Sequence, residues 1–270
     1  MFDVTTDSAR ETPQNRSPLG FGKEPGTAAL TPNPRERDLW WDVGLATFGI
    51  LAKTAFRLRV MGTANVPASG RALLAYNHVS VIDAVFVALP IVERGRAVHF
   101  FVLREDFERP IVGWGLRKIA QIPIHRSFGD WSAIETSAGV LMGGMLAGIA
   151  PEGTIGDGPG LLPGQKGAAR IALMAAAPVI PVGLWGMQHR WPKSGLTFSP
   201  PARPTVAVVY GEPIHSEGDP KCRPDVQALT DRIMGDIAML VAQARRRSEP
   251  TPNSSPPGAR RDDPPLSHVG

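Results

Sequence analysis

The segment that decides how this chain folds is RALLAYNHVSVIDAVFVAL, which runs from Arg71 to Leu89. Residues 71–76 form a short apolar run typical of a strand, and residues 84–89 form a second apolar run typical of a helix. Between them lie His78 and Asp83, five positions apart. On a regular helix such positions point about 140° away from each other, so the chain must turn here. We therefore expect His78 on a strand-to-helix loop, where Asp83 can curl back towards it.

A histidine and a carboxylate in this arrangement have two interpretations. A carboxylate on one ring nitrogen fixes the tautomer and leaves the other nitrogen free to take a proton from a hydroxyl. The positive end of a nearby helix dipole would favour the neutral imidazole that a base requires. The same residues also fit a capping box, in which Ser80 caps the helix and Asp83 bonds back to the cap amide. This segment alone does not decide between catalysis and helix capping.

Outward from this segment, strands and helices alternate to about residue 210. The predicted strands are residues 71–76, 97–103, 119–124, 146–150, 179–184 and 205–210. The predicted helices are residues 82–90, 109–118, 131–145 with Asp130 as cap, 167–176 and 224–246. This alternation predicts a single α/β domain with a mainly parallel central sheet flanked by helices. Ligands of such sheets bind beyond the carboxyl ends of the strands, where His78 lies.

Two polar segments flank this core. Residues 1–37 are rich in Thr, Pro, Asn and Gly, and residues 248–270 are rich in Pro and Ser, so we expect disordered tails on both sides. The N-terminus also has no apolar run behind a basic start, so we expect no signal peptide. Without these two tails, residues 38–247 remain as a single domain.

Residues 39–60 form an amphipathic helical element at the start of that domain. Two Trp at one end and Lys53, Arg57 and Arg59 at the other are typical of a helix that lies in a membrane interface. Only ten uncharged residues separate Asp42 from Lys53, whereas a spanning helix needs about 20. A helix that covers the protein's own core shows the same pattern.

Charge and cysteine content narrow the classes of partner. Residues 38–247 carry 22 basic and 17 acidic side chains, a net charge of +5, which suits an anionic partner. We expect no nucleic acid, because two Tyr and no basic-aromatic stripe give no stacking platform. The single cysteine, Cys222, excludes an internal disulfide and a thiol-rich metal site. Seven bases lie between residues 93 and 126: Arg94, Arg96, Arg104, Arg109, Arg117, Lys118 and Arg126.

Two further motifs follow predicted strands. Pro151-Glu152-Gly153-Thr154 brings a carboxylate, a bare backbone and a hydroxyl to one carboxyl end, and a glycine-rich run follows it. Glycines let amides approach a phosphate or an oxyanion, although an ordinary loop has the same composition. The run is not a P-loop, since no Gly-Lys-Ser or Gly-Lys-Thr follows. The block Ile122–Arg126 places a cation after another strand, where Arg126 can hold a phosphate or form a surface ion pair.

The order and spacing of these motifs resemble those of the glycerolipid acyltransferase family. The matching blocks are Asn77–Asp83, Ile122–Arg126, Pro151–Thr154 and Val179–Val182, and the likeness covers roughly residues 40–215. The branch that the chain resembles is the PlsC-like 1-acylglycerol-3-phosphate O-acyltransferases. Members of this branch acylate the free 2-hydroxyl of lysophosphatidic acid, which gives phosphatidic acid in phospholipid biosynthesis.

This resemblance implies roles for particular residues. His78 and Asp83 would be the two residues of the family's HX4D motif, with His78 as the base and Asp83 as its orienting partner. The residues implied to bind the phosphorylated acceptor are Arg126, Glu152, Gly153 and Thr154. The implied co-substrate is an acyl-coenzyme A or acyl carrier protein thioester, with no cofactor and no metal. An apolar groove near residues 111–114 is our expectation for the acyl chain.

The resemblance also implies a location and leaves alternatives. Residues 39–57 would dock on a membrane, which predicts a peripheral or monotopic protein on its cytoplasmic face. Ile155 follows Thr154 where many relatives have Arg, and this weakens the case for lysophosphatidic acid. Another lysolipid or glycerol 3-phosphate is therefore an alternative acceptor. A lipid ester hydrolase that uses the same His-Asp pair is an alternative from another class.

Overall fold

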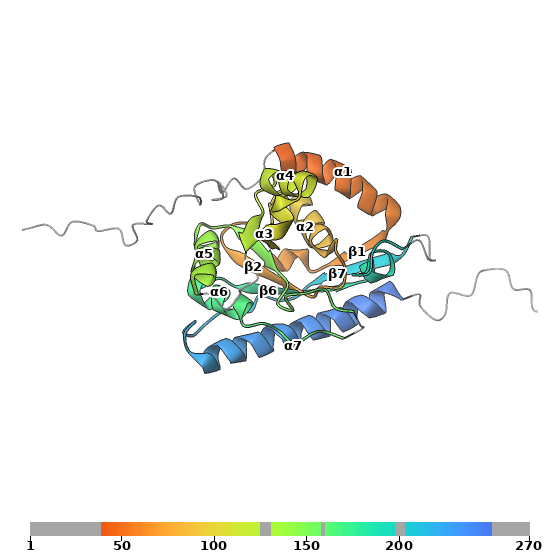
Figure 1. Cartoon of the computed structure of the whole chain (residues 1–270). Coiled ribbons are helices and arrows are strands. Elements are labelled where there is room, and N and C mark those ends of the chain that lie inside the picture. The colour runs from red at the N-terminus through yellow and green to blue at the C-terminus, as the bar shows by residue number, and fades with distance from the viewer. Residues whose placement is uncertain (1–38, 125–130, 158–159, 198–202, 250–270) are drawn as a thin grey trace, which may run out of the picture. The chain divides into compact units, whose positions relative to one another are not determined.

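The structure is a computed structural model that describes residues 39–124, 131–157, 160–197 and 203–249 (Figure 1). The strands are β1 (Arg57–Met61), β2 (Ala72–Tyr76), β3 (His99–Leu103), β4 (Ile122–Ile124), β5 (Leu146–Ile149), β6 (Val179–Trp185) and β7 (Thr205–Tyr210). The helices are α1 (Leu39–Ala55), α2 (Asp83–Glu93), α3 (Arg104–Glu108), α4 (Pro110–Lys118), α5 (Trp131–Met142), α6 (Gly167–Ala175) and α7 (Arg223–Ser248). Short 3₁₀ turns are η1 (Thr63–Asn65) and η2 (Met187–His189).

The described strands form one sheet in the order β1-β7-β6-β2-β5-β3-β4. Neighbouring strands are parallel except for β6 and β7, which are antiparallel. β2 lies in the middle between β5 and β6, and all five of its residues are buried. Strands covered on both faces are continuously apolar, as Ala72–Tyr76 is. The predicted α/β domain with a mainly parallel sheet is confirmed.

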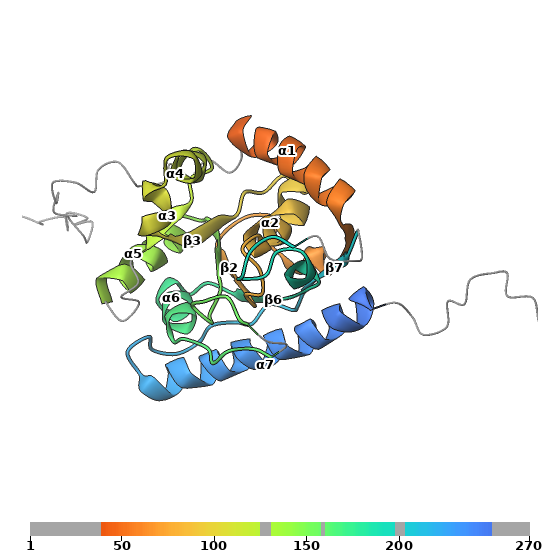
Figure 2. The same cartoon turned by 45° about the vertical axis from the view of Figure 1, so that its right-hand side comes forward.

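Helices cover both faces of this sheet, and the alternation of side chains along β2 shows which. Leu74 and Tyr76 point into a core shared with α1 and α2, whereas Leu73 and Ala75 point into a core shared with α5, α6 and α7. Figures 1 and 2 show α1 and α2 on one side of the sheet and α7 along the other. No helix in the described part of the chain is long and apolar enough to cross a membrane.

The predicted helical element 39–60 is wrong at its C-terminal end. α1 ends at Ala55, and Arg57–Met61 is an edge strand that pairs in parallel with β7. Arg57 and Arg59 fit the basic end of an interface helix, but they alternate with the half-buried Leu58 and Val60, which is the period of a strand. Pairing with a strand about 150 residues later decided between the two.

Other element boundaries shift by a few residues. The predicted strand 119–124 shortens to Ile122–Ile124, because Ala120 takes a left-handed backbone conformation with φ 49° just after α4. α3 was not predicted. The two predicted tails, and with them Asp130, lie outside the described residues, apart from Ser248 at the end of α7 and Glu249 after it.

Candidate active site

The segment after β2 is fastened to the sheet by Asn77. Its side-chain Nδ2 donates to the Leu184 carbonyl at 3.0 Å, and the Leu184 amide donates to its Oδ1 at 2.7 Å. Asn77 is buried and acts as an extra pair of ladder bonds to β6 after β2 has ended. The sequence motif contained Asn77 but gave it no role, because its partner is 107 positions away. This anchor sets the direction in which the chain leaves the sheet at His78.

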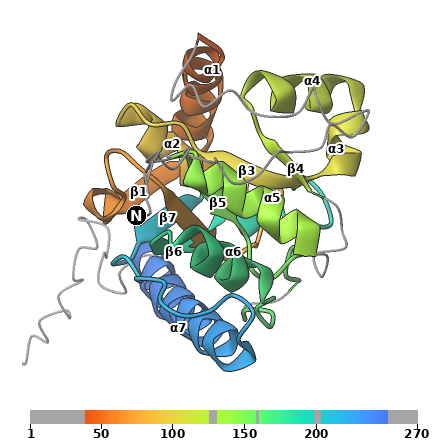
Figure 3. The ribbon, with the colours of Figure 1, turned by 90° about the vertical axis from the view of Figure 1, so that its left-hand side faces the viewer.

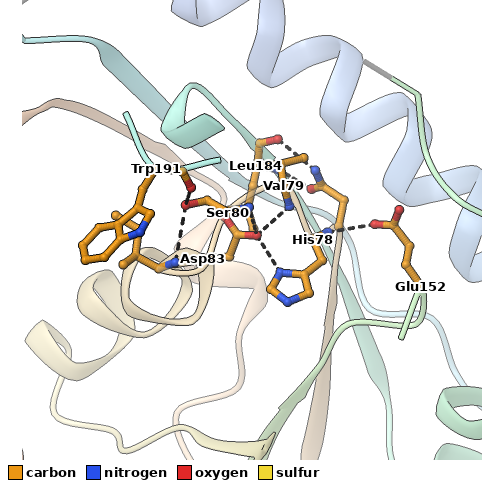
Figure 4. A network of polar contacts seen from close by, with 9 residues as sticks. His78, Val79, Ser80, Asp83, Glu152, Leu184 and Trp191 are labelled. Atoms are coloured by element: carbon orange, nitrogen blue, oxygen red, sulfur yellow. Dashed lines mark hydrogen bonds and ion pairs between the residues drawn. The ribbon is translucent and has the colours of Figure 1, made fainter. Parts of the chain in front are cut away.

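His78 and Asp83 meet as the spacing predicted. The ring Nδ1 lies 2.9 Å from Asp83 Oδ2, and the same oxygen accepts the amides of Val79 at 2.7 Å and Ser80 at 2.9 Å (Figure 4). One carboxylate thus orients the ring and ties the turn before α2, so the two interpretations of the motif are not exclusive. Ser80 does not directly precede α2, because Ile82 holds that position. The Ser80 hydroxyl donates to the Trp191 carbonyl at 2.6 Å and accepts the Ile82 amide at 3.4 Å.

The electrostatics of this pair follow from its burial. Asp83 is fully buried, which raises the pKa of its carboxyl, while the His78 ring and the two amides oppose that shift. Because Oδ2 already accepts two N–H bonds, it is an acceptor for the ring as well, and Nδ1 carries the proton. Figure 4 shows the other ring nitrogen on the side away from Asp83, and the His78 side chain is 24% exposed. Nε2 is therefore the nitrogen available to a hydroxyl.

Glu152 reaches the same histidine from the loop after β5. Its Oε1 accepts the His78 amide at 2.8 Å (Figure 4), and its Oε2 accepts the Leu162 amide at 2.7 Å. Burial raises the pKa of the Glu152 carboxyl, and these two amide bonds oppose the shift. The Gly156 amide donates to the His78 carbonyl at 2.8 Å. The loop after β5 therefore holds both polar groups of the His78 main chain. Gly156 begins the glycine-rich run noted in the sequence, but its contact with His78 was not predicted.

Three further residues were predicted for the site, namely Gly153, Thr154 and Arg126. Gly153 turns the chain with φ +71°, a conformation that favours glycine, and its amide donates to the Ala150 carbonyl at 3.1 Å. Thr154 is exposed beside it. Arg126 lies outside the described residues. The structure thus brings His78, Asp83 and Glu152 together, with Gly153 and Thr154 on the same loop as Glu152.

An apolar cavity of about 450 Å³ adjoins the loop that carries His78. Ile82, which precedes Asp83, lines it, and so does Trp191, which accepts the Ser80 hydroxyl. The cavity is lined from α1 by Phe48, Leu51, Ala52 and Ala55, from α2 by Val85 and Phe86, and otherwise by Phe56, Ile82, Arg190, Trp191 and Leu196. The groove that we expected at residues 111–114 is not part of it, and Ile111 is 85% exposed on α4.

The sequence profile of a family described as Acyltransferase matches residues 57–185, which include the β2–α2 loop and the loop after β5. Over these residues, just under half of its length, the chain is similar to the acyltransferase family. It is 28% identical over 158 residues to the 1-acyl-sn-glycerol-3-phosphate acyltransferase of Bacillus subtilis, an alignment that covers 58% of this chain and 74% of that protein. It is 24% identical over 188 residues to the chloroplastic enzyme of that name, LPAT1, from Arabidopsis thaliana, covering 68% of this chain and 49% of the relative.

A solved structure supports the fold. The 1-acyl-sn-glycerophosphate acyltransferase PlsC from Thermotoga maritima superimposes with a TM-score of 0.63 at 22% sequence identity. The match covers 78% of this chain and 81% of the PlsC chain. The two proteins therefore share the PlsC-like fold.

Proposed function

We propose that this acyltransferase moves a fatty acyl group from an acyl-coenzyme A or acyl carrier protein thioester to the free 2-hydroxyl of 1-acylglycerol-3-phosphate, which makes phosphatidic acid. The observation that carries the proposal is the 2.9 Å contact between His78 Nδ1 and Asp83 Oδ2 at the carboxyl end of β2. The names of the Bacillus and Arabidopsis relatives support this acceptor.

In the proposed reaction His78 is the general base. Its Nε2 takes the proton of the acceptor hydroxyl while the hydroxyl oxygen attacks the thioester carbon. A carbon–oxygen bond forms, the carbon–sulfur bond breaks when the tetrahedral intermediate collapses, and the imidazolium returns the proton to the leaving thiolate. Asp83 holds the ring in the tautomer that leaves Nε2 unprotonated and stabilises the imidazolium. No acyl-enzyme is required.

The oxyanion of that intermediate needs donors that are not yet engaged. The amides of Val79 and Ser80 donate to Asp83, and the Gly153 amide donates to Ala150. These three amides are therefore not available to the oxyanion, and we assign them no part in stabilising it.

The acceptor phosphate is proposed to bind at Arg126 and Thr154, with Gly153 allowing close approach of the backbone. Arg126 follows β4 in the sequence, and a guanidinium can grip a phosphate with two parallel bonds. Glu152 belongs to this loop, but both its oxygens already accept amides, so we propose that it positions His78 rather than contacting the acceptor. The cavity beside Ile82 is the proposed place for an acyl chain, because it is apolar and adjoins the catalytic loop.

The acceptor is tested by offering the purified protein a panel of lysolipids and glycerol 3-phosphate with both donor types, followed by mass spectrometry of the products. We expect phosphatidic acid from 1-acylglycerol-3-phosphate. A preference for another lysolipid or for glycerol 3-phosphate would overturn the acceptor and would agree with Ile155 in place of an arginine. Donor consumption that needs no acceptor would instead indicate a hydrolase.

We also propose that residues 38–247 form the acyltransferase domain and that α1 docks this domain on the cytoplasmic face of a membrane as a peripheral or monotopic protein. Its substrates are lipids, and α1 carries large apolar side chains on its exposed face.

A further inference from the structure

Exposed apolar side chains concentrate on two helices that are far apart in the sequence. Among the described residues, eight of the thirteen large apolar side chains that are exposed lie on α1 and α4. We call them the α1–α4 apolar surface: Leu39, Val43, Phe48, Ile50, Leu51, Ile111, Val112 and Trp114. Single exposed apolar residues are ordinary on a soluble protein, but a contiguous group marks a contact surface.

The two helices are joined by an aromatic contact. The rings of Trp40 on α1 and Trp114 on α4 meet edge to face, with centroids 5.2 Å apart and planes at 86°. Figures 1, 2 and 3 all place α4 on the α1 side of the sheet, away from α7. On α4, Ile111 is 85% exposed and Trp114 is 51% exposed, whereas Gly113 is buried. The outer sides of α1 and α4 therefore belong to one surface.

A positively charged side chain, Lys118, lies against the two tryptophan rings that join α1 to α4. The Lys118 ammonium lies 4.8 Å from the centroid of Trp40 and 5.9 Å from that of Trp114. Arg117 and Lys118 both stand in the last turn of α4 and are exposed. Tryptophan rings with basic side chains beside an apolar face are the composition found at the headgroup level of membranes, and each such cation is attracted to anionic lipid.

α7 shows how a water-facing helix of the same domain is built. Met239 is its exposed large apolar residue, and its outer face carries the ion pairs Arg232–Asp236 at 3.0 Å and Arg245–Glu249 at 2.8 Å. Both α1 and α7 bury one face against the domain, but among the described residues α1 exposes five large apolar side chains and α4 three, whereas α7 exposes one. Folding alone does not require that difference, so it points to the surroundings of α1 and α4.

We propose that α4 is a second membrane-docking element which, together with α1, binds an anionic lipid bilayer, with Ile111, Val112 and Trp114 entering the interface and Lys118 at the depth of the lipid phosphates. This inference rests on the proposed function only because that function makes the substrates lipids. Beyond the docking of α1, it assigns α4 to the same membrane contact and predicts a preference for anionic lipid. Phe48 and Leu51 belong both to this surface and to the lining of the apolar cavity, so a lipid chain can pass from the bilayer towards Ile82 within apolar surroundings.

The apolar part is tested by sedimentation of the full chain with vesicles. Ile111→Asn removes a side chain that is 85% exposed, so the fold should tolerate it, and Met239→Asn on α7 is the matched control at 65% exposure. With equimolar phosphatidylcholine–phosphatidylglycerol vesicles we expect the vesicle Kd to rise about tenfold for Ile111→Asn and to stay unchanged for the control. Trp114→Ala should weaken binding further, with circular dichroism confirming that it is folded. Equal binding by Ile111→Asn and the unsubstituted protein would overturn the inference.

The charge part compares Lys118→Glu with Arg246→Glu, an exposed basic residue of α7. We expect Lys118→Glu to weaken binding to the mixed vesicles by at least about fivefold, to leave binding to pure phosphatidylcholine little changed, and to lose its effect at high salt. An equal loss on both vesicle types, or the same loss for Arg246→Glu, would overturn the preference for anionic lipid.

Two controls separate this inference from its alternatives. Turnover of a short-chain acceptor dispersed without vesicles should be the same for Ile111→Asn and the unsubstituted protein. If neither protein turns over the acceptor, the proposed function fails while the vesicle result still decides the docking surface. If the protein instead ignores vesicles and sediments as a dimer that Ile111→Asn dissociates, the surface binds a second copy and the lipid inference is overturned.

Discussion

The loop after β2 and the loop after β5 both hold His78 in place, but they contact different parts of this residue. Each ends a neighbouring parallel strand, and each buries a carboxylate that accepts two backbone amides. Asp83 accepts amides from its own loop and also the His78 ring, whereas Glu152 accepts one amide from its own loop and one from His78. One carboxylate therefore sets the direction of the ring, and the other sets the position of the backbone that carries it.

This difference teaches that two similar acids beside one histidine need not share a role. A group that touches the ring acts on the reacting nitrogen, so its loss should appear in the rate of the chemical step. A group that touches only the main chain acts through position, so its loss should appear in stability as well as in rate. The following changes separate the two.

The largest effect should come from His78→Ala, because it removes the base that both loops serve. We expect kcat to fall by at least about 10⁵-fold, with an unchanged thermal unfolding midpoint, since the ring is partly exposed. The measurement is product formation under saturating donor and acceptor. His215→Ala, which changes an exposed histidine, is the control and should retain full activity. Retained turnover in His78→Ala would remove the base assignment.

Asp83→Asn tests the ring-orienting loop. An amide can place its NH₂ group towards Nδ1 and so favour the wrong tautomer, and we expect kcat to fall by about 10³–10⁴-fold with little change in the KM of either substrate. Steady-state kinetics measure both constants. Asp231→Asn on the exposed side of α7 is the matched control. A normal kcat in Asp83→Asn would show that the ring needs no orienting acid.

Arg126 belongs to neither loop, so Arg126→Ala tests binding of the acceptor separately from orientation of His78. If this guanidinium holds the acceptor phosphate, the acceptor KM should rise by about 10–100-fold, the loss of a hydrogen bond to a charged group, while kcat changes little. Initial rates over a range of acceptor concentrations give both values. Arg246→Ala, on the surface of α7, should leave them unchanged. An unaltered acceptor KM would count against a phosphate role for Arg126.

Glu152→Gln tests the backbone-positioning loop. A glutamine keeps one acceptor oxygen but turns an NH₂ group towards the amide of His78 or Leu162, so we expect the free energy of unfolding to fall by about 1–3 kcal/mol. The rate should fall by about tenfold through displacement of His78, without a selective rise in acceptor KM. Urea denaturation and kinetics test this, with the exposed Glu212→Gln as control. A selective rise in acceptor KM at unchanged stability would make Glu152 a binding residue.

The smallest effect concerns pH. Burial raises the pKa of Glu152, so the folded chain holds this proton more tightly than the unfolded chain does. Glu152 then contributes most to stability at pH values below the pKa that its carboxyl has in the unfolded chain. This contribution is lost as pH rises from that pKa to the higher pKa of the same carboxyl in the folded chain. The unfolding free energy of the unsubstituted protein minus that of Glu152→Gln should therefore fall as pH increases from about 4. A difference that is flat or rises would contradict the assigned direction.

Local patterns predicted much of the site because its first part is local. His78 and Asp83 are five residues apart, and the apolar runs on either side require a strand, a turn and a helix, so their contact follows from the segment itself. The same local reasoning was wrong for Arg57 and Arg59, since two arginines fit both a helix end and an edge strand. It placed Gly156 only in a glycine-rich run, and it implied that Glu152 binds the acceptor without predicting its bond to the His78 amide.

The sequence by itself therefore determined the α/β alternation, the turn at His78 and the order of the motifs, because each depends on residues within one or two helical turns or a single strand. Only the tertiary structure decided that Glu152 holds the His78 amide from 74 positions away, that Asn77 locks onto Leu184, and that Trp40 and Trp114 join α1 to α4. Those contacts depend on which strands become neighbours and which helix faces are buried together. Strand order and burial are properties of the whole packed chain, and no single segment encodes them.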